Sequence, residues 1–383
     1  MKDLIIQEIN CLPDDWQQAA TIIPYGSGLE AYRSLKRIIE DFEVPYIIDA
    51  DPAKKGQLVY GIPIVGIDAL KNLEANSKIV ITIAKRRYAE IKEQLESLGF
   101  REYNDFCHIS QFAIEWYFKY KDECSIFSMD IAITTKCTLK CKNCNMFIPC
   151  YKEHINYSFE EIKKNLDLFF ERIDYVFEIG ILGGEPFLNK DLCKITEYMF
   201  EKYADRFGSL CITTNGTIIP DKSILSVIKK YHVIMIISDY RYAIQQKSKI
   251  EELLPVLSEA GIIYNIRKDL VWCEFGFPTN PVNVSEDKAE EHMMSCDPGW
   301  RGLSDGKFFF CNVAWSAEKA GLFSLNENDY INLSDLKPNN EEDKVRLLKY
   351  SLGIMPLGYM SFCRVCGGCG EDNKNIVKAG EQL

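Results

Sequence analysis

The stretch that decides how this chain folds is Asp130–Cys144, which reads DIAITTKCTLKCKNC. Residues 130–134 predict a strand, and the cysteines that follow have the spacing Cys-x3-Cys-x2-Cys, at Cys137, Cys141 and Cys144. Three thiolates on one loop can ligate three irons of a 4Fe–4S cube and leave the fourth iron open to a ligand from outside the protein. Structural zinc is the alternative, although zinc normally takes four closed ligands and no fourth Cys or His follows at a zinc-like spacing.

A series of strands and helices continues from this segment. Strands are expected at 176–182, 210–214, 233–238 and 262–267, with helices near 158–173, 190–205, 221–231 and 247–260. Ser158 and Glu161 form a capping-box pattern that opens the first of these helices. A repeated strand–helix unit is typical of α/β barrels, so we expect a partial (β/α)6 barrel over residues 126–288.

Three turns after these strands match one family in order. They read Gly183-Gly184-Glu185-Pro186, then Thr213-Thr214-Asn215-Gly216-Thr217, then Ser238-Asp239. Together with the cysteine spacing, they resemble the radical S-adenosylmethionine superfamily. The resemblance implies that the first turn meets the methionine end of S-adenosylmethionine and that the last one contacts its ribose. The implied cofactor-binding residues are Gly183, Gly184, Glu185, Thr214, Asn215, Ser238 and Asp239. One departure is Asn143, where the family often has an aromatic residue near the adenine.

The resemblance also implies a chemistry. A 4Fe–4S cluster on the three cysteines, reduced by an external donor such as flavodoxin or ferredoxin, splits S-adenosylmethionine into a 5′-deoxyadenosyl radical. That radical abstracts hydrogen from a substrate, in an oxidoreductase or epimerase reaction. In epimerases of the superfamily a thiol returns the hydrogen, and the loop cysteines Cys150, Cys273 and Cys369 are the candidates here.

A second group of cysteines stands in the last part of the chain, residues 289–383. Its pattern is Cys296-x9-Gly306-x4-Cys311, followed by Cys363-x2-Cys366-x2-Cys369. This resembles the twitch form of the SPASM module, which implies one auxiliary cluster, of the 4Fe–4S type, on Cys296, Cys311, Cys363 and Cys366, acting as an electron relay. Cys369 is the alternative ligand, and zinc is the alternative metal.

The region 1–115 predicts a separate parallel α/β sheet. Gly26-Ser27-Gly28 follows a strand, and a helix over 29–41 has apolar residues at 29, 32, 35, 38 and 39. Asp49 and Asp51 come about twenty residues after the glycines, where an acid can meet a ribose hydroxyl. Residues 20–110 resemble the Rossmann-like N-terminal domain of bacterial sugar acetyltransferases. That likeness implies a nucleotide- or lipid-linked sugar as substrate, in glycan or polysaccharide biosynthesis; a docking domain that has lost its ligand is the alternative.

Composition limits the remaining classes. The chain has 383 residues and a net charge of −11, which disfavours general nucleic-acid binding. Its apolar runs are too short to span a bilayer, and its 15 cysteines suit a reducing compartment, so we expect a cytoplasmic protein. A peptide or protein maturase and a non-enzymatic zinc-binding scaffold are the alternative functions. His292 lies just before Cys296 and could support the cysteine group from outside its ligand set, but an exposed loop residue is the favoured interpretation.

Overall fold

The computed structural model describes residues 12–84, 87–268, 270–296, 300–370 and 372–383. Two compact units make up the chain. The first comprises Met1–Phe127, Ile173–Glu178 and Lys344–Leu348, and the second comprises Ser128–Arg172, Ile179–Asp343 and Lys349–Leu383. Both combine helices with parallel strands, which confirms the predicted α/β class. The finer division at 1–115, 126–288 and 289–383 stays a prediction.

A six-stranded sheet in the order β3-β4-β2-β1-β5-β6 organises the first unit. Its strands are β1 (Ile22–Tyr25), β2 (Ile47–Ile48), β3 (Leu58–Val59), β4 (Ile62–Val65), β5 (Lys78–Ile81) and β6 (Phe106–His108), and its helices are α2 (Leu29–Asp41), α3 (Tyr88–Ser97) and α4 (Ile109–Lys121). β1 pairs in parallel with β2 on one side and with β5 on the other. The strand order therefore reverses between β1 and β5, at the end of β1 where the glycine loop begins.

The central strands of this sheet are buried on both faces. Ile23 packs in one cluster with Ile91 and Leu95 of α3, whereas its neighbour Ile22 packs in another with Phe112 of α4. Because successive side chains point to opposite faces, a strand covered on both sides reads as an unbroken apolar run. This is why the sequence predicted β1 correctly without an alternating pattern.

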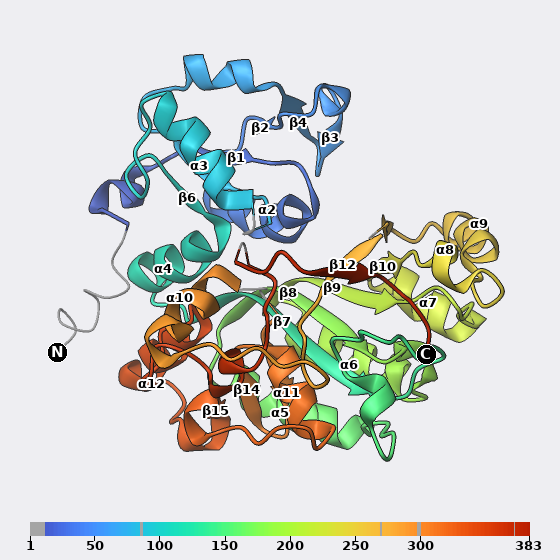
Figure 1. Ribbon diagram of the computed structural model, residues 1–383. Coiled ribbons are helices and arrows are strands. Elements are labelled where there is room, and N and C mark those ends of the chain that lie inside the picture. Colours follow the sequence, from blue (N-terminus) through green and yellow to red (C-terminus); the bar gives the residue numbers. More distant parts are fainter. Residues whose placement is uncertain (1–11, 85–86, 269, 297–299, 371) are drawn as a thin grey trace. The chain divides into compact units, whose positions relative to one another are not determined.

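An eight-stranded sheet in the order β11-β10-β9-β8-β7-β13-β14-β15 organises the second unit (Figure 1). Its strands are β7 (Ser125–Thr134), β8 (Tyr175–Gly183), β9 (Phe207–Thr214), β10 (Ile234–Ser238), β11 (Tyr264–Arg267), β13 (Gly302–Ser304), β14 (Lys307–Phe309) and β15 (Tyr330–Asn332). β7 to β11 stand side by side in chain order, and β13 continues the sheet in parallel beside β7. The five strands expected in the barrel region all form.

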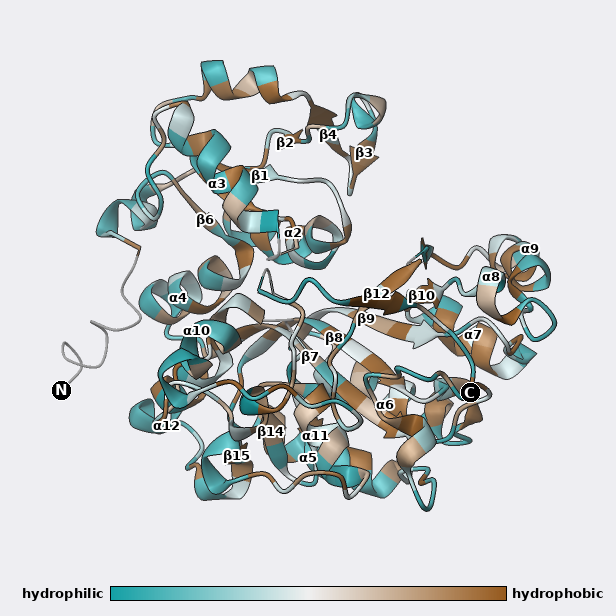
Figure 2. Ribbon diagram, in the orientation of Figure 1, coloured by the Kyte–Doolittle hydropathy of each residue, from teal (hydrophilic) through white to brown (hydrophobic). Residues whose placement is uncertain are grey.

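Helices connect the successive strands of this sheet. They are α5 (Phe159–Phe170), α6 (Leu192–Tyr203), α7 (Lys222–Lys230), α8 (Arg241–Ile244) and α9 (Ile250–Ala260), and α10 (Glu286–Cys296), α11 (Asn312–Lys319) and α12 (Glu341–Ser351) follow. The capping box predicted for α5 is present, with Ser158 accepting from the Glu161 backbone and Glu161 accepting in return. Figure 2 shows brown, apolar residues gathering along the strands and teal ones mostly on helices and loops.

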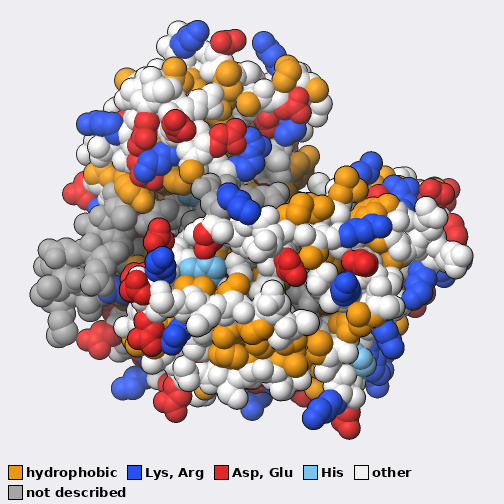
Figure 3. Space-filling model, viewed as in Figure 1, with side chains coloured by type: hydrophobic (Ala, Val, Ile, Leu, Met, Phe, Trp, Pro, Cys, Tyr) orange, Lys and Arg blue, Asp and Glu red, His pale blue; other side chains and the backbone are white. Residues whose placement is uncertain are grey.

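A two-stranded antiparallel sheet joins two distant parts of the second unit. Its strands are β12 (Val271–Cys273) and β16 (Ile376–Lys378). Acidic and basic side chains are interspersed over the face shown in Figure 3, so neither sign of charge dominates that face. No helix among the described residues combines the length and the apolar character needed to cross a membrane.

Candidate functional site

The turns after β7 and β8 are joined through their backbones. Gly184 N donates to Thr134 O at 2.9 Å, and Glu185 N donates to Lys136 O at 2.8 Å. A Cβ on Gly183 would lie 2.2 Å from Thr134 O, and one on Gly184 would lie 2.1 Å from Lys136 O. Only glycine allows this approach, which holds the glycine turn against the start of the cysteine loop.

Glu185 joins the turn after β8 to the turn after β9. Its side chain is completely buried and accepts hydrogen bonds from Thr214 Oγ1, at 2.9 and 3.0 Å, and from Asn215 N, at 2.9 Å. Burial raises the pKa of Glu185 to about 7, because these donors only partly offset the loss of water. No Lys, Arg or His in the described part of the chain pairs with this carboxylate, so the site holds a buried acid without a cation partner.

Asn215 extends the same network to the first cysteine. Its Nδ2 donates to Cys137 Sγ at 3.5 Å and to Thr138 Oγ1 at 3.1 Å, while its Oδ1 accepts from Thr217 N at 3.0 Å. The predicted residues of the first two turns, Gly183, Gly184, Glu185, Thr214 and Asn215, are therefore brought together beside the cysteine loop. The C-terminal ends of parallel strands meet at one edge of a sheet, which explains this convergence.

The three cysteines of the loop lie in one apolar cluster. Cys137, Cys141 and Cys144 pack together around Leu139 and Ile244, with Tyr240, Ala243 and Trp272 at the edge. Burial raises the pKa of Cys137 to about 11 and that of Cys144 to about 12, and the nearby Cys141 raises the pKa of both further. Thiols whose pKa values are raised in this way need a positively charged partner before they can act as thiolates.

An iron–sulfur cluster fits this donor set. It takes thiolates from cysteines and supplies the positive charge that the buried sulfurs lack. In the described part of the chain, no three His, Cys, Asp or Glu side chains are gathered to hold a single metal ion. The fit therefore rests on three cysteine sulfurs that share one apolar environment.

Ser238 ends β10 and Asp239 follows it, and the structure gives the aspartate a partner. Arg241 donates to the buried Asp239 carboxylate through Nη2 at 2.7 Å and through Nε at 3.0 Å. This pairing lowers the pKa of Asp239. The next residue, Tyr240, packs on the cysteine loop. The described hydrogen bonds and ion pairs join neither Ser238 nor Asp239 to the cysteines.

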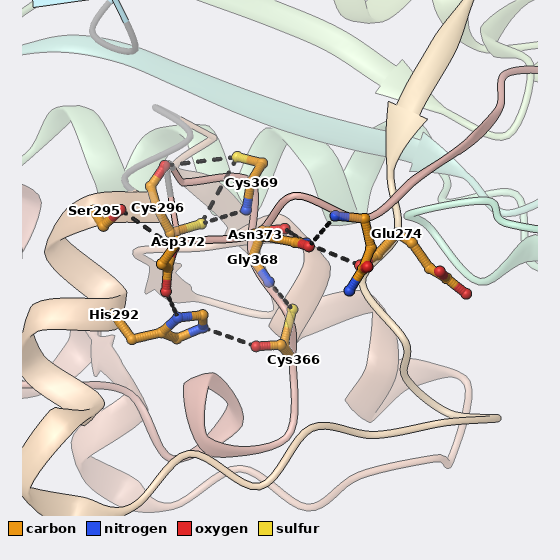
Figure 4. A network of polar contacts seen from close by, with 10 residues as sticks. Glu274, His292, Ser295, Cys296, Cys366, Gly368, Cys369, Asp372 and Asn373 are labelled. Atoms are coloured by element: carbon orange, nitrogen blue, oxygen red, sulfur yellow. Dashed lines mark hydrogen bonds and ion pairs between the residues drawn. The ribbon is translucent and has the colours of Figure 1, made fainter.

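The second group of cysteines comes from three places in the chain, and Figure 4 shows three of its members, Cys296, Cys366 and Cys369. Cys296 ends α10, Cys311 is the N-cap of α11, and Cys363 and Cys366 lie around a short 3-10 turn. Burial raises the pKa of Cys311 to about 11, and the nearby Cys296 adds to the shift. Burial also raises the pKa values of Cys363 and Cys366, and the nearby Cys311 and Cys296 raise both values further. The four predicted ligands thus share one environment.

Cys369 lies beside this group. Its Sγ is 3.8 Å from Cys296 Sγ, and its backbone N donates to the same sulfur at 3.3 Å. Gly368, at φ +67°, brings its backbone so close that a Cβ would meet Cys296 Sγ at 3.3 Å. Cys369, the alternative ligand, therefore contacts Cys296, one of the four predicted ligands.

The interpretation of His292 as an exposed loop residue is wrong. His292 lies within α10 and is 8 % exposed. One ring nitrogen is hydrogen-bonded to Asp372, and the other is 2.8 Å from Cys366 O (Figure 4). The helical spacing of four residues to Cys296 could have suggested a shared face. Two further residues, Gln382 and Arg241, contact the sites without any signal in the sequence.

Comparison with known proteins adds a family and a set of similar structures. No curated protein matches the chain. The solved structure of BtrN in complex with AdoMet and 2-DOIA matches at 18% identity and a TM-score of 0.45, over 67% of this chain and 99% of that one. Native anSMEcpe with bound AdoMet matches at 14% identity and a TM-score of 0.40, over 63% of this chain and 89% of that one. SuiB of Streptococcus suis bound to precursor peptide SuiA matches at 13% identity and a TM-score of 0.32, over 74% of this chain and 83% of that one.

The family model covers the part of the chain that carries the first site. Residues 131–238 match the model described as Radical SAM superfamily. This range runs from within β7 to the end of β10 and includes the cysteine trio, the first two turns and Ser238, and it ends one residue before Asp239. The chain therefore contains a radical SAM domain.

Proposed function

We propose that this chain reductively cleaves S-adenosylmethionine and uses the resulting radical to oxidise or epimerise a sugar. When bound, a 4Fe–4S cluster with one open iron supplies the electron that breaks the sulfur–carbon bond and yields a 5′-deoxyadenosyl radical. The observation that carries the proposal is the convergence of Cys137, Cys141 and Cys144 beside the turns after β8 and β9.

The chain's own residues would bind and orient the cofactor. The ionised Glu185 is a buried carboxylate that lacks a cation, and the methionine ammonium is a cation of the right kind. Gly183 and Gly184 leave backbone close to the cysteine loop without side chains to fill the space. Trp272 and Tyr240 pack edge to face at 5.3 Å against the apolar cluster of the trio, where they would help to exclude water from it.

A sugar substrate is proposed from the first unit taken by itself. The Gly26–Gly28 loop follows β1 at the point where the strand order reverses, which is where open α/β sheets bind ligands. Although burial alone raises it, hydrogen bonds from Ser27, Asp51 and Lys54 bring the pKa of Asp49 down to about 2. Asp49 thus stays ionised and keeps the loop in place. We propose that this loop holds the nucleotide or lipid-phosphate end of the sugar.

We further propose an auxiliary 4Fe–4S cluster on Cys296, Cys311, Cys363 and Cys366. Four thiolates would occupy every iron, so the cluster would relay electrons without binding substrate. A relay that removes the electron from a substrate radical gives net two-electron oxidation, and this favours dehydrogenation. The electron that starts the reaction would come from an external donor such as a flavodoxin or ferredoxin.

An anaerobic turnover assay tests the proposal. The reduced protein is incubated with S-adenosylmethionine and, separately, with a panel of nucleotide-sugars, lipid-linked sugars and peptides, and 5′-deoxyadenosine is measured. We expect one sugar class to raise its release above the background without substrate. The matched controls are Cys141→Ala, which should abolish release, and Cys193→Ala on α6, outside both cysteine groups, which should leave it unchanged.

Other outcomes have defined meanings in the same assay. Stimulation by peptides alone would replace the sugar proposal with the peptide maturase. Zinc instead of iron and sulfide, with no 5′-deoxyadenosine, would replace it with the zinc-binding scaffold. About eight irons per chain supports both clusters, and about four leaves the auxiliary one without support.

A further inference from the structure

The segment 380–383 pairs with the cysteine loop as a short additional strand. Lys142 N donates to Glu381 O at 2.7 Å, and Leu383 N donates to Lys140 O at 2.9 Å. An antiparallel bridge lies between these two hydrogen bonds. The contact joins parts of the second unit that are about 240 residues apart in sequence, and it lies directly over the middle cysteine of the trio.

Gln382 uses its whole side-chain amide in this contact. Its Oε1 accepts from Lys140 N at 2.9 Å, and its Nε2 donates to Gly380 O at 2.7 Å and to Cys141 Sγ at 3.3 Å. The backbone N–H of Lys140 can only donate, and the carbonyl of Gly380 can only accept. These two partners fix which end of the amide is oxygen, so an N–H donor faces the sulfur.

The segment is anchored before it reaches the loop. Ala379 is completely buried, and its carbonyl accepts from Tyr242 Oη at 2.6 Å. Gly380 has φ +69°, and a Cβ there would lie 2.8 Å from the Tyr240 side chain. The chain arrives from β16, which is paired with β12, and Figure 1 shows it leaving that pair toward the C label. Gln382 is therefore held in position by its surroundings and not by the sulfur alone.

We propose that Gln382 is a positioning residue that donates to the Cys141 thiolate of the bound cluster and raises the cluster's reduction potential. The reduced cluster carries one more negative charge than the oxidised cluster, and a donor beside a ligating sulfur stabilises that charge. The inference rests on the proposed function, because it requires a cluster on the loop of Cys137, Cys141 and Cys144.

Two substitutions separate this role from a purely structural one. Gln382→Glu keeps an oxygen for Lys140 N but replaces the donor that faces the sulfur with a second acceptor. Gln382→Met keeps the length of the side chain and removes both the oxygen that accepts from Lys140 N and the donor that faces Cys141 Sγ. The matched control is Glu381→Gln, which alters an exposed side chain in the same strand while its backbone contact with Lys142 is kept.

The measurement is the midpoint potential of the cluster whose electron paramagnetic resonance signal changes when S-adenosylmethionine is added. It is made on the whole chain with both clusters loaded. We expect a more negative potential for Gln382→Met, a still more negative one for Gln382→Glu, and the parental value for Glu381→Gln. A residue that only pinned the strand would give the reverse order, because Gln382→Glu retains the hydrogen bond to the loop.

Each remaining result counts for or against the inference. Equal potentials in the parent and in Gln382→Glu overturn it, and the proposed function is then unaffected. A parent that binds no iron on the cysteine trio, shown by an unchanged signal on adding S-adenosylmethionine, overturns the proposed function and the inference together. If Gln382→Met fails to fold, Gln382→Glu decides the question alone.

Discussion

The buried Glu185 carboxylate accepts the Thr214 hydroxyl hydrogen bond at 2.9 and 3.0 Å, so one acid joins the turns after β8 and β9. The arrangement places a group that prefers to be neutral at the centre of a site that we propose to bind a cation. The pH dependence of stability therefore tests whether Glu185 is buried as described.

Glu185 makes stability fall as pH rises through a defined window. Burial raises its pKa from 4.5 to about 7, so between these values the folded chain holds a proton that the unfolded chain has lost. More protons bound in the folded state means that the free energy of unfolding decreases with pH, by up to about 1.4 kcal/mol per unit. Glu185→Gln should remove this slope in thermal unfolding measured without S-adenosylmethionine.

Glu160→Gln is the control for that experiment, because Glu160 is exposed on α5. It should keep the parental pH dependence. Parallel curves for the parent and for Glu185→Gln between pH 4.5 and 7 would show that the carboxylate is not buried as described.

Gly184→Ala should damage the site through its backbone. The new Cβ would lie 2.1 Å from Lys136 O, which is backbone and cannot move aside cheaply. We expect a loss of about 2–4 kcal/mol in stability together with loss of iron from the first site. Gly66→Ala is the control, since a Cβ there meets nothing within 4 Å. Full iron retention in Gly184→Ala would contradict the close approach of the two turns.

His292→Ala should weaken the second cysteine group and leave the first intact. The ring links Asp372 to the carbonyl of Cys366, and without it the Cys366 loop loses a buried support. Iron per chain should drop from about eight to about four, while release of 5′-deoxyadenosine without substrate continues. The control is His232→Asn, because His232 is exposed and has φ +53°, which Asn tolerates. Unchanged iron in His292→Ala would contradict this role.

Separate serine substitutions assign the fourth ligand of the second group. Cys366 shares the electrostatic environment of Cys311 and Cys296, so Cys366→Ser should lose the auxiliary cluster. Cys369 contacts Cys296 alone among the cysteines in the described contacts, so Cys369→Ser should retain it. Iron and sulfide analysis of the two proteins decides, and the opposite pair of results would make Cys369 the ligand.

Local patterns predicted the regular elements closely. The helix expected over residues 29–41 forms as α2 with those bounds, and the Ser158–Glu161 capping box opens α5 as expected. Both signals come from neighbours within one or two turns of helix, which act before any tertiary contact is made.

The same local reasoning failed to predict which residues of α2 are buried, because their burial depends on packing against the sheet. On α2 the apolar period placed Tyr32 and Ile39 on the buried face, but they are 37% and 41% exposed. Ala31 and Ser34 are completely buried instead. Small side chains let a helix approach its sheet closely, and that preference depends on the sheet beneath and not on the helix alone.

By itself, the sequence determined the alternation of strands and helices and the spacing of the cysteines, because both depend on residues close together in the chain. Tertiary structure alone decided that Glu185 meets Thr214, that His292 supports Cys366 and that Gln382 reaches Cys141. Such contacts form only once parallel strands have aligned and distant segments have packed on them, so no local pattern can encode them.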